Sequence, residues 1–375
     1  AYALIYRAYY AFIKNPRINS KGFNTSAILG FVNTLEEVLK KENPTHIGVA
    51  FDPSGPTFRH EAFEQYKAQR EETPEAIRLS VPIIKEIIRA YRIPILEVAG
   101  YEADDVIGTL ATEAGRQGII TYMMTPDKDY GQLVSDKVFM YRPKHTGGFE
   151  VMGVDEVKAK FDIQSPAQVI DMLGLMGDSS DNIPGCPGVG EKTAQKLIAE
   201  FGSIENLLEH TDQLKGALKT KVETNREMIT FSKFLATIKI DVPIQLDMDS
   251  LVREQADEDS LRQIFEELEF RTLIDRVLKK ENAGNGITTP TGNKTAAEKS
   301  NLAPLPLFPE EGGAVQGDLF ANFTGNEPGE AKNSNLATLE TLNCDYQLID
   351  TEEKRTKIIQ KLLTSKILSL DTETT

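Results

Sequence analysis

Apolar residues recur at helical spacing along most of the first 280 residues of the chain. The clearest helix is predicted at 27–39, with a start near Thr25 or Ser26. Its apolar face consists of Ala27, Ile28, Phe31, Val32, Leu35, Val38 and Leu39. The same spacing predicts helices at 1–12, 77–88, 106–114 and 194–201, and others up to about residue 280. A helix at 165–176 is predicted to open with Ser165 as its cap and Pro166 as its first residue.

Short apolar runs between these helices predict strands. Residues 46–51 and 119–124 have the continuous apolar character of buried parallel strands. Residues 138–141 and 149–151 predict a hairpin. Helices that alternate with buried strands indicate an α/β fold, with a mostly parallel central sheet and flanking helices.

Composition bounds the class of protein. The 375 residues allow two domains or more and a sizeable core. We find no signal peptide and no apolar run long enough to cross a membrane. Cys186 and Cys344 lie far apart without metal-ligand spacing, which favours a reducing cytosol.

The chain divides into four predicted regions. We expect a core at 1–164, a helical part at 165–280 and a disordered linker rich in Gly and Pro at 281–339. Order is predicted to resume at 340–375, as strand, helix and a strand that ends at Asp371 and Glu373. The chain starts without Met, and both ends fall inside predicted elements, so we expect a fragment of a longer protein.

Carboxylates gather at the start of one predicted helix and after two predicted strands. Three of them occupy four residues at 102–105, where they would complement the helix dipole but repel one another unless protons or cations intervene. Others follow the strands, at the sheet edge where ligands bind in open α/β folds. A last pair lies in a loop, where acids are more often turn formers. The set is Asp52, Glu102, Asp104, Asp105, Asp127, Asp129, Asp178 and Asp181.

Cations and glycines supply candidate phosphate contacts. The segment 57–78 interleaves aromatic residues with Arg59, Lys67, Arg70 and Arg78. Such a run is typical of a solvated helix face, but its place after Asp52 favours phosphate binding. The net charge of -15 argues only superficially against a nucleic-acid partner, because a carboxylate site stays acidic until metals bind.

Glycines also precede the predicted helix at 194–201, in the sequence 187–190. Backbone N–H groups at such a helix start suit an anion. Because the loop lies between two helices, it resembles a helix-hairpin-helix element, which grips the duplex backbone without reading sequence.

Six motifs stand in order along the chain. They are Phe51-Asp52, Thr57-Phe-Arg-His60, Tyr66-Lys67, Tyr101-Glu-Ala-Asp-Asp105, Thr125-Pro-Asp-Lys-Asp129 and Gly177-Asp-Ser-Ser-Asp-Asn182. Together they closely resemble the 5′ nuclease domains of the bacterial DNA polymerase I family, relatives of the flap endonucleases, over about residues 1–280. The residues from 340 are similar to the start of the 3′–5′ exonuclease domain of that family. The resemblance implies a flap-endonuclease-like fold with a helical arch and a helix–three-turn–helix that binds DNA.

The resemblance also implies residue roles. The eight carboxylates would hold two divalent ions, Mg²⁺ or Mn²⁺, and Lys67 and Arg70 would act on the scissile phosphate. DNA contacts are implied for Arg7, Arg59, Tyr66, Gly185, Gly188, Gly190, Lys192 and Thr193. The loop at 185–193 would hold a monovalent cation as well. Two divalent ions about 3.5–4 Å apart can activate a water and neutralise the transferring group, and they prefer oxygen ligands.

The implied activity is hydrolysis of 5′ flaps and nicked duplex DNA, including removal of RNA primers, within a monomeric, cytoplasmic DNA-directed DNA polymerase. The peptide Gln316–Phe320 resembles sequences that bind the sliding clamp. The family places one more metal-ligating Asp at the end of a first strand, which would fall before Ala1, so we expect this fragment to be impaired. Two other interpretations stay open. One is a non-catalytic, structure-specific DNA-binding module, and the other is a phosphohydrolase for small phosphate esters.

Overall fold

A computed structural model describes residues 1–144 and 148–278, together with residues 354 and 356. The chain divides into two units, Ala1–Phe320 and Ala321–Thr375, and the elements described below belong to the first. The predicted linker at 281–339, the predicted region at 340–375 and the peptide Gln316–Phe320 lie outside the described residues. No helix among those residues is both long and apolar enough to cross a membrane.

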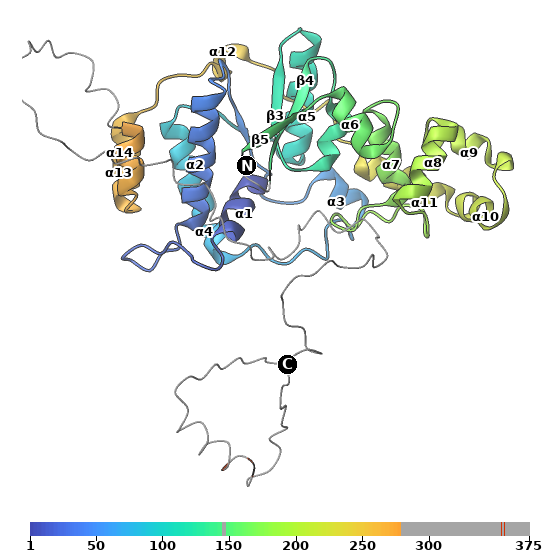
Figure 1. Cartoon of the computed structure of the whole chain (residues 1–375), viewed down its shortest axis with the longest axis horizontal. Helices are drawn as coiled ribbons and strands as arrows, with labels where there is room; N and C mark the ends of the chain where they lie inside the picture. Colours follow the sequence, from blue (N-terminus) through green and yellow to red (C-terminus); the bar gives the residue numbers. More distant parts are fainter. Residues whose placement is uncertain (145–147, 279–353, 355, 357–375) are drawn as a thin grey trace, which may run out of the picture. The chain divides into compact units, whose positions relative to one another are not determined.

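The strands form two small sheets (Figure 1). In one, β1 (Val49–Ala50) pairs in parallel with β2 (Ile95–Leu96). In the other, β3 (Thr121–Met124) pairs in parallel with β4 (Val138–Pro143), which pairs antiparallel with β5 (Phe149–Met152). The strands predicted at 46–51 and 119–124 and the hairpin are therefore confirmed, although both predicted strands are shorter in the structure. Among the described residues β1 and β3 share no backbone hydrogen bonds. The two parallel strand pairs, β1 with β2 and β3 with β4, therefore belong to separate sheets.

Helices of the first half follow the apolar spacing closely. They are α1 (Tyr2–Ala11), α2 (Ser26–Lys41), α3 (Phe58–Ala62), α4 (Glu75–Ala90) and α5 (Ala103–Arg116). The apolar face predicted for α2 is buried at Ile28, Phe31 and Val32, and Thr25 is its N-cap residue. The residues between α3 and α4 that include Tyr66 and Lys67 form turns and not a helix.

The second half is almost entirely helical. It contains α6 (Val154–Phe161), α7 (Gln168–Met176), α8 (Glu191–Phe201), α9 (Ile204–Glu209), α10 (Gly216–Thr224), α11 (Arg226–Ala236), α12 (Met248–Leu251), α13 (Glu258–Glu267) and α14 (Arg271–Leu278). The helix predicted to open at Ser165 begins at Gln168 instead. The side chain of Gln168 accepts hydrogen bonds from the backbone N–H groups of Gln164 and Ser165 and so holds these residues outside the helix.

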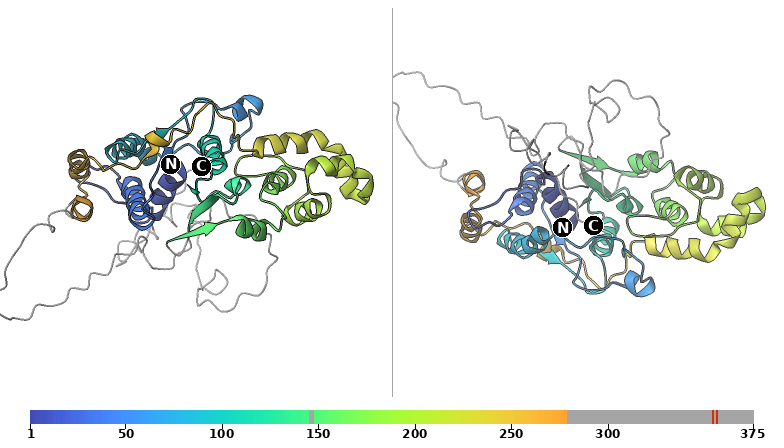
Figure 2. Two further views of the ribbon diagram at one scale, coloured as in Figure 1. Left: turned by 90° about the horizontal axis from the view of Figure 1, so that it is seen from above. Right: turned by 90° about the horizontal axis from the view of Figure 1, so that it is seen from below.

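Two large apolar cores, and a small one at Val106, Leu110 and Val242, stabilise the described elements. One large core packs α1, α2 and α4 against the returning helices α13 and α14, through residues such as Ile84, Leu261 and Phe265. The other large core packs β3 and β4 against α7, α8 and α11. Figures 1 and 2 show α13 and α14 beside α2 and α4, and α8 to α11 gathered at the other end of the first unit.

Candidate metal centre

The start of α5 gathers three carboxylates. Glu102 is the N-cap residue, and the side chain of Asp105 accepts a hydrogen bond from its backbone N–H (3.1 Å) in a capping box. Asp104 lies between them in the first turn. Carboxylate oxygens of the three residues lie within 4.8 Å of one another, a spacing that allows a metal ion to be held.

Strand ends bring further acids to this helix start. Asp52 follows β1, and its Oδ1 accepts a hydrogen bond from the N–H of Ala103 (2.9 Å). Asp127 follows β3 and accepts one from the N–H of Asp129 (3.0 Å). Oδ1 of Asp129 is buried and has no hydrogen-bond partner among the described residues. A buried acceptor without a donor is costly, so the donor set fits an oxygen-preferring cation.

The loop after α7 closes the site from the other side. Nζ of Lys67 lies 2.6 Å from Oε1 of Glu102 and 3.6 Å from Oδ2 of Asp181, and thus bridges the helix start and the loop. Arg70 also forms an ion pair with Asp181. Lys67 has a left-handed backbone (φ 57°), a conformation that costs free energy in a non-glycine residue and recurs at functional sites.

Burial raises the pKa of several carboxyl groups of the centre. Burial is the main cause for Asp104, and the charge of Glu102 adds to it, so that this pKa stands well above its usual value. The pKa of Asp129 is raised well above its usual value by burial and by Asp127. Burial also raises the pKa of Asp127 itself. These groups hold protons more readily than free carboxylates do.

Two other carboxyl groups have lowered pKa values. Burial alone would raise the pKa of Glu102, but the charges of Lys67 and Arg59 outweigh it. For Asp181, Lys67 and Arg70 outweigh burial in the same way. The centre therefore combines carboxylates that are paired with cations and carboxyl groups that favour protons.

Three residues predicted to contact DNA, namely Arg59, Tyr66 and Gly185, are buried in this structure. Arg59 is 1% exposed and Tyr66 is 3% exposed. The hydroxyl of Tyr66 lies 2.9 Å from Oε2 of Glu102, inside the carboxylate cluster. The N–H of Gly185 donates to the hydroxyl of Ser232 (2.9 Å), so it is not available to a phosphate. The polar groups of these residues point into the protein, because they form hydrogen bonds with buried partners there.

The other candidate DNA contacts lie on accessible segments. Gly188, Gly190 and Lys192 are exposed at the start of α8, and Thr193 is partly exposed. Arg7 projects from α1 toward the end of β4, where its Nη2 donates to the carbonyl of Lys144 (2.7 Å). Their contacts with DNA stay a prediction.

Several site residues were not identified from the sequence. Lys128 lies between Asp127 and Asp129 in the sequence, and it forms an ion pair with Asp178 (2.7 Å). Its place inside the motif Thr125–Asp129 was the available signal. The carbonyl groups of Leu235 and Thr237 accept hydrogen bonds from Arg59 across more than 170 residues, and no local pattern indicates them.

An α/β unit with an acidic centre, followed by a helical domain, is the fold of a flap-endonuclease-like nuclease. The bacteriophage T5 flap endonuclease, solved in a complex with DNA and metal ions, shares this fold. Its TM-score is 0.52 at 22% sequence identity, over 72% of this chain and 97% of that one.

Sequence comparison identifies the family. Residues 1–162 match the 5′–3′ exonuclease N-terminal resolvase-like domain, and residues 164–259 match the 5′–3′ exonuclease C-terminal SAM fold. The chain belongs to the 5′–3′ exonuclease family, which confirms the resemblance drawn from the six motifs. DNA polymerase I of Bacillus caldotenax is 42% identical over 72% of this chain and 31% of its own length. DNA polymerase I of Bacillus subtilis is 43% identical over 73% of this chain and also 31% of its own length. The chain thus spans about a third of these relatives.

Proposed function

We propose that this chain is a structure-specific 5′ nuclease that hydrolyses phosphodiester bonds in 5′ flaps and nicked duplex DNA with two divalent ions, Mg²⁺ or Mn²⁺. The observation that carries the proposal is the convergence of the strand-end, helix-start and loop acids on one centre, bridged by Lys67. The orphan oxygen of Asp129 supports a cation there.

The carboxylates would divide into two groups around the ions. Asp52, Glu102 and Asp104 lie at the start of α5, and Asp127, Asp129, Asp178 and Asp181 lie at the end of β3 and in the loop after α7. When bound, the ions supply an activated water and neutralise charge on the transferring group. Asp105 lies next to the first group in the sequence, and its carboxylate is paired with Arg59.

Lys67 and Arg70 would act on the scissile phosphate. Both contact metal-site carboxylates in the present structure, so a phosphate that reaches the centre meets two cations already in place. Contacts that strengthen as charge develops would accelerate the chemical step more than they tighten substrate binding.

The exposed start of α8 would hold the duplex backbone. Gly188, Gly190 and Lys192 present backbone N–H groups and a cation at a helix start, and Thr193 adds a hydroxyl, a setting that favours phosphate. A monovalent cation at this loop is part of the same proposal. The T5 complex with DNA and metal ions, which shares the fold, supports a DNA substrate.

The wider function follows the relatives. Both Bacillus relatives are named DNA polymerase I, so we propose that the complete protein is a DNA-directed DNA polymerase that removes RNA primers, in the cytoplasm and as a monomer. Clamp binding through Gln316–Phe320 is a separate proposal. A peptide of that sequence should bind a bacterial sliding clamp and lose binding after Leu319→Ala and Phe320→Ala.

The test is cleavage of a 5′-labelled flap substrate with and without Mg²⁺ or Mn²⁺. We expect metal-dependent cleavage near the junction and none in EDTA. Binding of flap DNA without cleavage at any metal concentration would favour the DNA-binding module. Cleavage of small phosphate esters that duplex DNA does not inhibit would favour the small-ester phosphohydrolase.

A further inference from the structure

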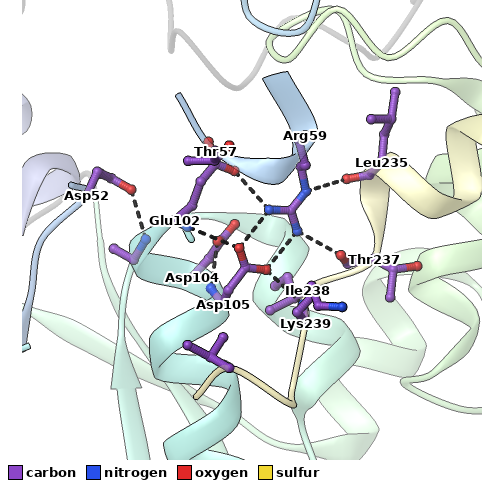
Figure 3. A network of polar contacts seen from close by, with 12 residues as sticks. Asp52, Thr57, Arg59, Glu102, Asp104, Asp105, Leu235, Thr237, Ile238 and Lys239 are labelled. Carbon is purple, nitrogen blue, oxygen red and sulfur yellow. Dashed lines mark hydrogen bonds and ion pairs between the residues drawn. The ribbon is translucent and has the colours of Figure 1, made fainter. Parts of the chain in front are cut away.

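Arg59 is a buried arginine in the middle of the acidic centre. Its side chain comes from α3 and reaches the start of α5 and the C-terminal end of α11 (Figure 3). A solvent-facing arginine would leave several of its five N–H groups to water. Here each of them has a protein acceptor.

The acceptors can be counted group by group. Nε donates to the carbonyl of Leu235 (2.9 Å). Nη1 donates to Oε2 of Glu102 (3.1 Å) and Oδ2 of Asp105 (2.8 Å), and Nη2 donates to Oδ1 of Asp105 (2.8 Å) and the carbonyl of Thr237 (2.7 Å). Guanidinium has five N–H donors and all are used, so Arg59 has none left for a DNA phosphate.

Asp105 is saturated in the same way. Its Oδ1 accepts from Arg59 and from the N–H of Lys239 (2.8 Å), and its Oδ2 accepts from Arg59 and from the N–H of Glu102 (3.1 Å). A carboxylate offers about four lone-pair directions, and four donors occupy them. Asp105 is fully buried, so a metal ion would have to break one of these contacts to bind it.

We propose that Arg59 and Asp105 form a positioning pair that contacts neither DNA nor metal. The pair holds both ends of Glu102, its backbone N–H through Asp105 and its carboxylate through Arg59. It also ties residues 235–239, at the end of α11 and just after it, to the start of α5. The metal-binding carboxylate and the duplex-binding domain are thereby held in one fixed relation. The inference rests on the proposed nuclease function and assigns these two residues a role within it.

The test compares Arg59→Lys, Asp105→Asn and the double variant. Arg59→Lys keeps the charge but loses the planar fork, and Asp105→Asn keeps the shape but loses the charge. Four quantities are measured: Mn²⁺ affinity without DNA, flap affinity at several salt concentrations, the single-turnover cleavage rate at saturating DNA and metal, and thermal stability.

Each single variant should weaken Mn²⁺ binding and slow cleavage by about tenfold or more, because partners that orient a metal ligand typically have this effect. The double variant should be no worse than the poorer single variant, because either change breaks the same unit. Flap affinity and its salt dependence should stay unchanged.

A matched control separates positioning from loss of fold. Lys233 on α11 forms an ion pair (2.6 Å) with Asp171 on α7, which is also buried, within the helical domain. Asp171→Asn should lower the melting temperature to a similar extent, yet leave Mn²⁺ affinity and the cleavage rate unchanged well below that temperature. Equal losses of metal affinity in the control would overturn the proposal.

Other outcomes would also overturn it. Strong loss of Mn²⁺ binding in Asp105→Asn with none in Arg59→Lys would make Asp105 a direct ligand. A shallower salt dependence of flap binding in Arg59→Lys would make Arg59 a phosphate contact. If the unsubstituted chain binds Mn²⁺ but cleaves no DNA, the proposed nuclease function is wrong. The Mn²⁺ titrations of the variants would still test whether Arg59 and Asp105 position Glu102.

Discussion

Replacement of Gly190 should separate DNA binding from folding. Gly190 is the N-cap residue of α8 and has an extended backbone (φ -96°, ψ -178°) that any residue adopts. A Cβ added there would meet no atom within 4 Å. Asp and Asn are favoured at N-caps, so Gly190→Asp and Gly190→Asn should leave stability unchanged or raise it by about a few tenths of a kcal/mol.

The two variants differ only in charge. If the start of α8 holds a backbone phosphate, Asp places a second negative charge near it, whereas Asn does not. Two unit charges about 4 Å apart in water repel by about 1 kcal/mol, which is about a fivefold loss of affinity for each phosphate contacted. Gly190→Asp should therefore weaken binding to nicked duplex at least about fivefold relative to Gly190→Asn, and more strongly at low salt.

The assay is equilibrium binding to one nicked duplex at three salt concentrations, with a thermal melt of each variant. Gly185→Ala is the contrasting variant. Gly185 has φ +64°, and an added Cβ would lie 2.3 Å from the backbone nitrogen of Gly177, so this change should destabilise the fold itself. Equal affinities of the Asp and Asn variants for DNA would show that no phosphate lies near Gly190 and would refute the assignment.

Three further predictions concern the metal centre. Asp104→Ala or Asp127→Ala should abolish cleavage and leave flap binding within about twofold, since these carboxylates serve the ions and not the duplex; equal loss of binding in a gel shift would contradict this. Lys67→Ala and Arg70→Ala should slow single-turnover cleavage more than they weaken binding, and Lys67→Ala should not weaken Mn²⁺ binding, because it removes a cation that contacts Glu102; loss of DNA affinity alone would exclude the catalytic role. Mn²⁺ affinity should fall as pH is lowered through the raised pKa values of Asp104 and Asp129, with protons released on binding, and calorimetry in two buffers of different ionisation enthalpy measures this.

Local patterns predicted the elements and the acids, but not which charged residues are buried. The spacing of Ile28, Phe31 and Val32 is enough to specify an amphipathic helix, because burial of one face depends only on helical period. Arg59 and Lys67 fall in one stretch with the same composition, and the sequence gives no means to tell them apart.

What distinguishes them is long-range. Arg59 is enclosed by carbonyl groups of residues 235 and 237, whereas Lys67 keeps a partly open side chain between Glu102 and Asp181. Tyr66 illustrates the same limit. Its sequence neighbours are cations, which predicts an exposed aromatic residue. In the structure its hydroxyl instead donates a hydrogen bond to Glu102 inside the protein. The missed contacts are those that depend on how the helical domain docks on α5, which no local periodicity encodes.

Removal of divalent ions should leave the protein folded, although eight carboxylates converge. Most of the acidic groups have a local means of compensation in the described structure. Arg59 neutralises Asp105, Lys67 and Arg70 neutralise Asp181, and Lys128 neutralises Asp178. Arg59 and Lys67 also pair with Glu102, and the raised pKa values of Asp104 and Asp129 allow these two groups to hold protons.

A protein whose fold depends on metal, by contrast, unfolds when chelated. We therefore expect a cooperative melt in EDTA, with near-native helical circular dichroism at 25 °C. Saturating Mn²⁺ should add stability by mass action, about 2.7 kcal/mol at a concentration one hundred times the dissociation constant. This gain should shrink at lower pH, where protons compete for Asp104 and Asp129. Loss of helical signal in EDTA would show that the internal cations do not balance the acids, and the proposed compensation would then be wrong.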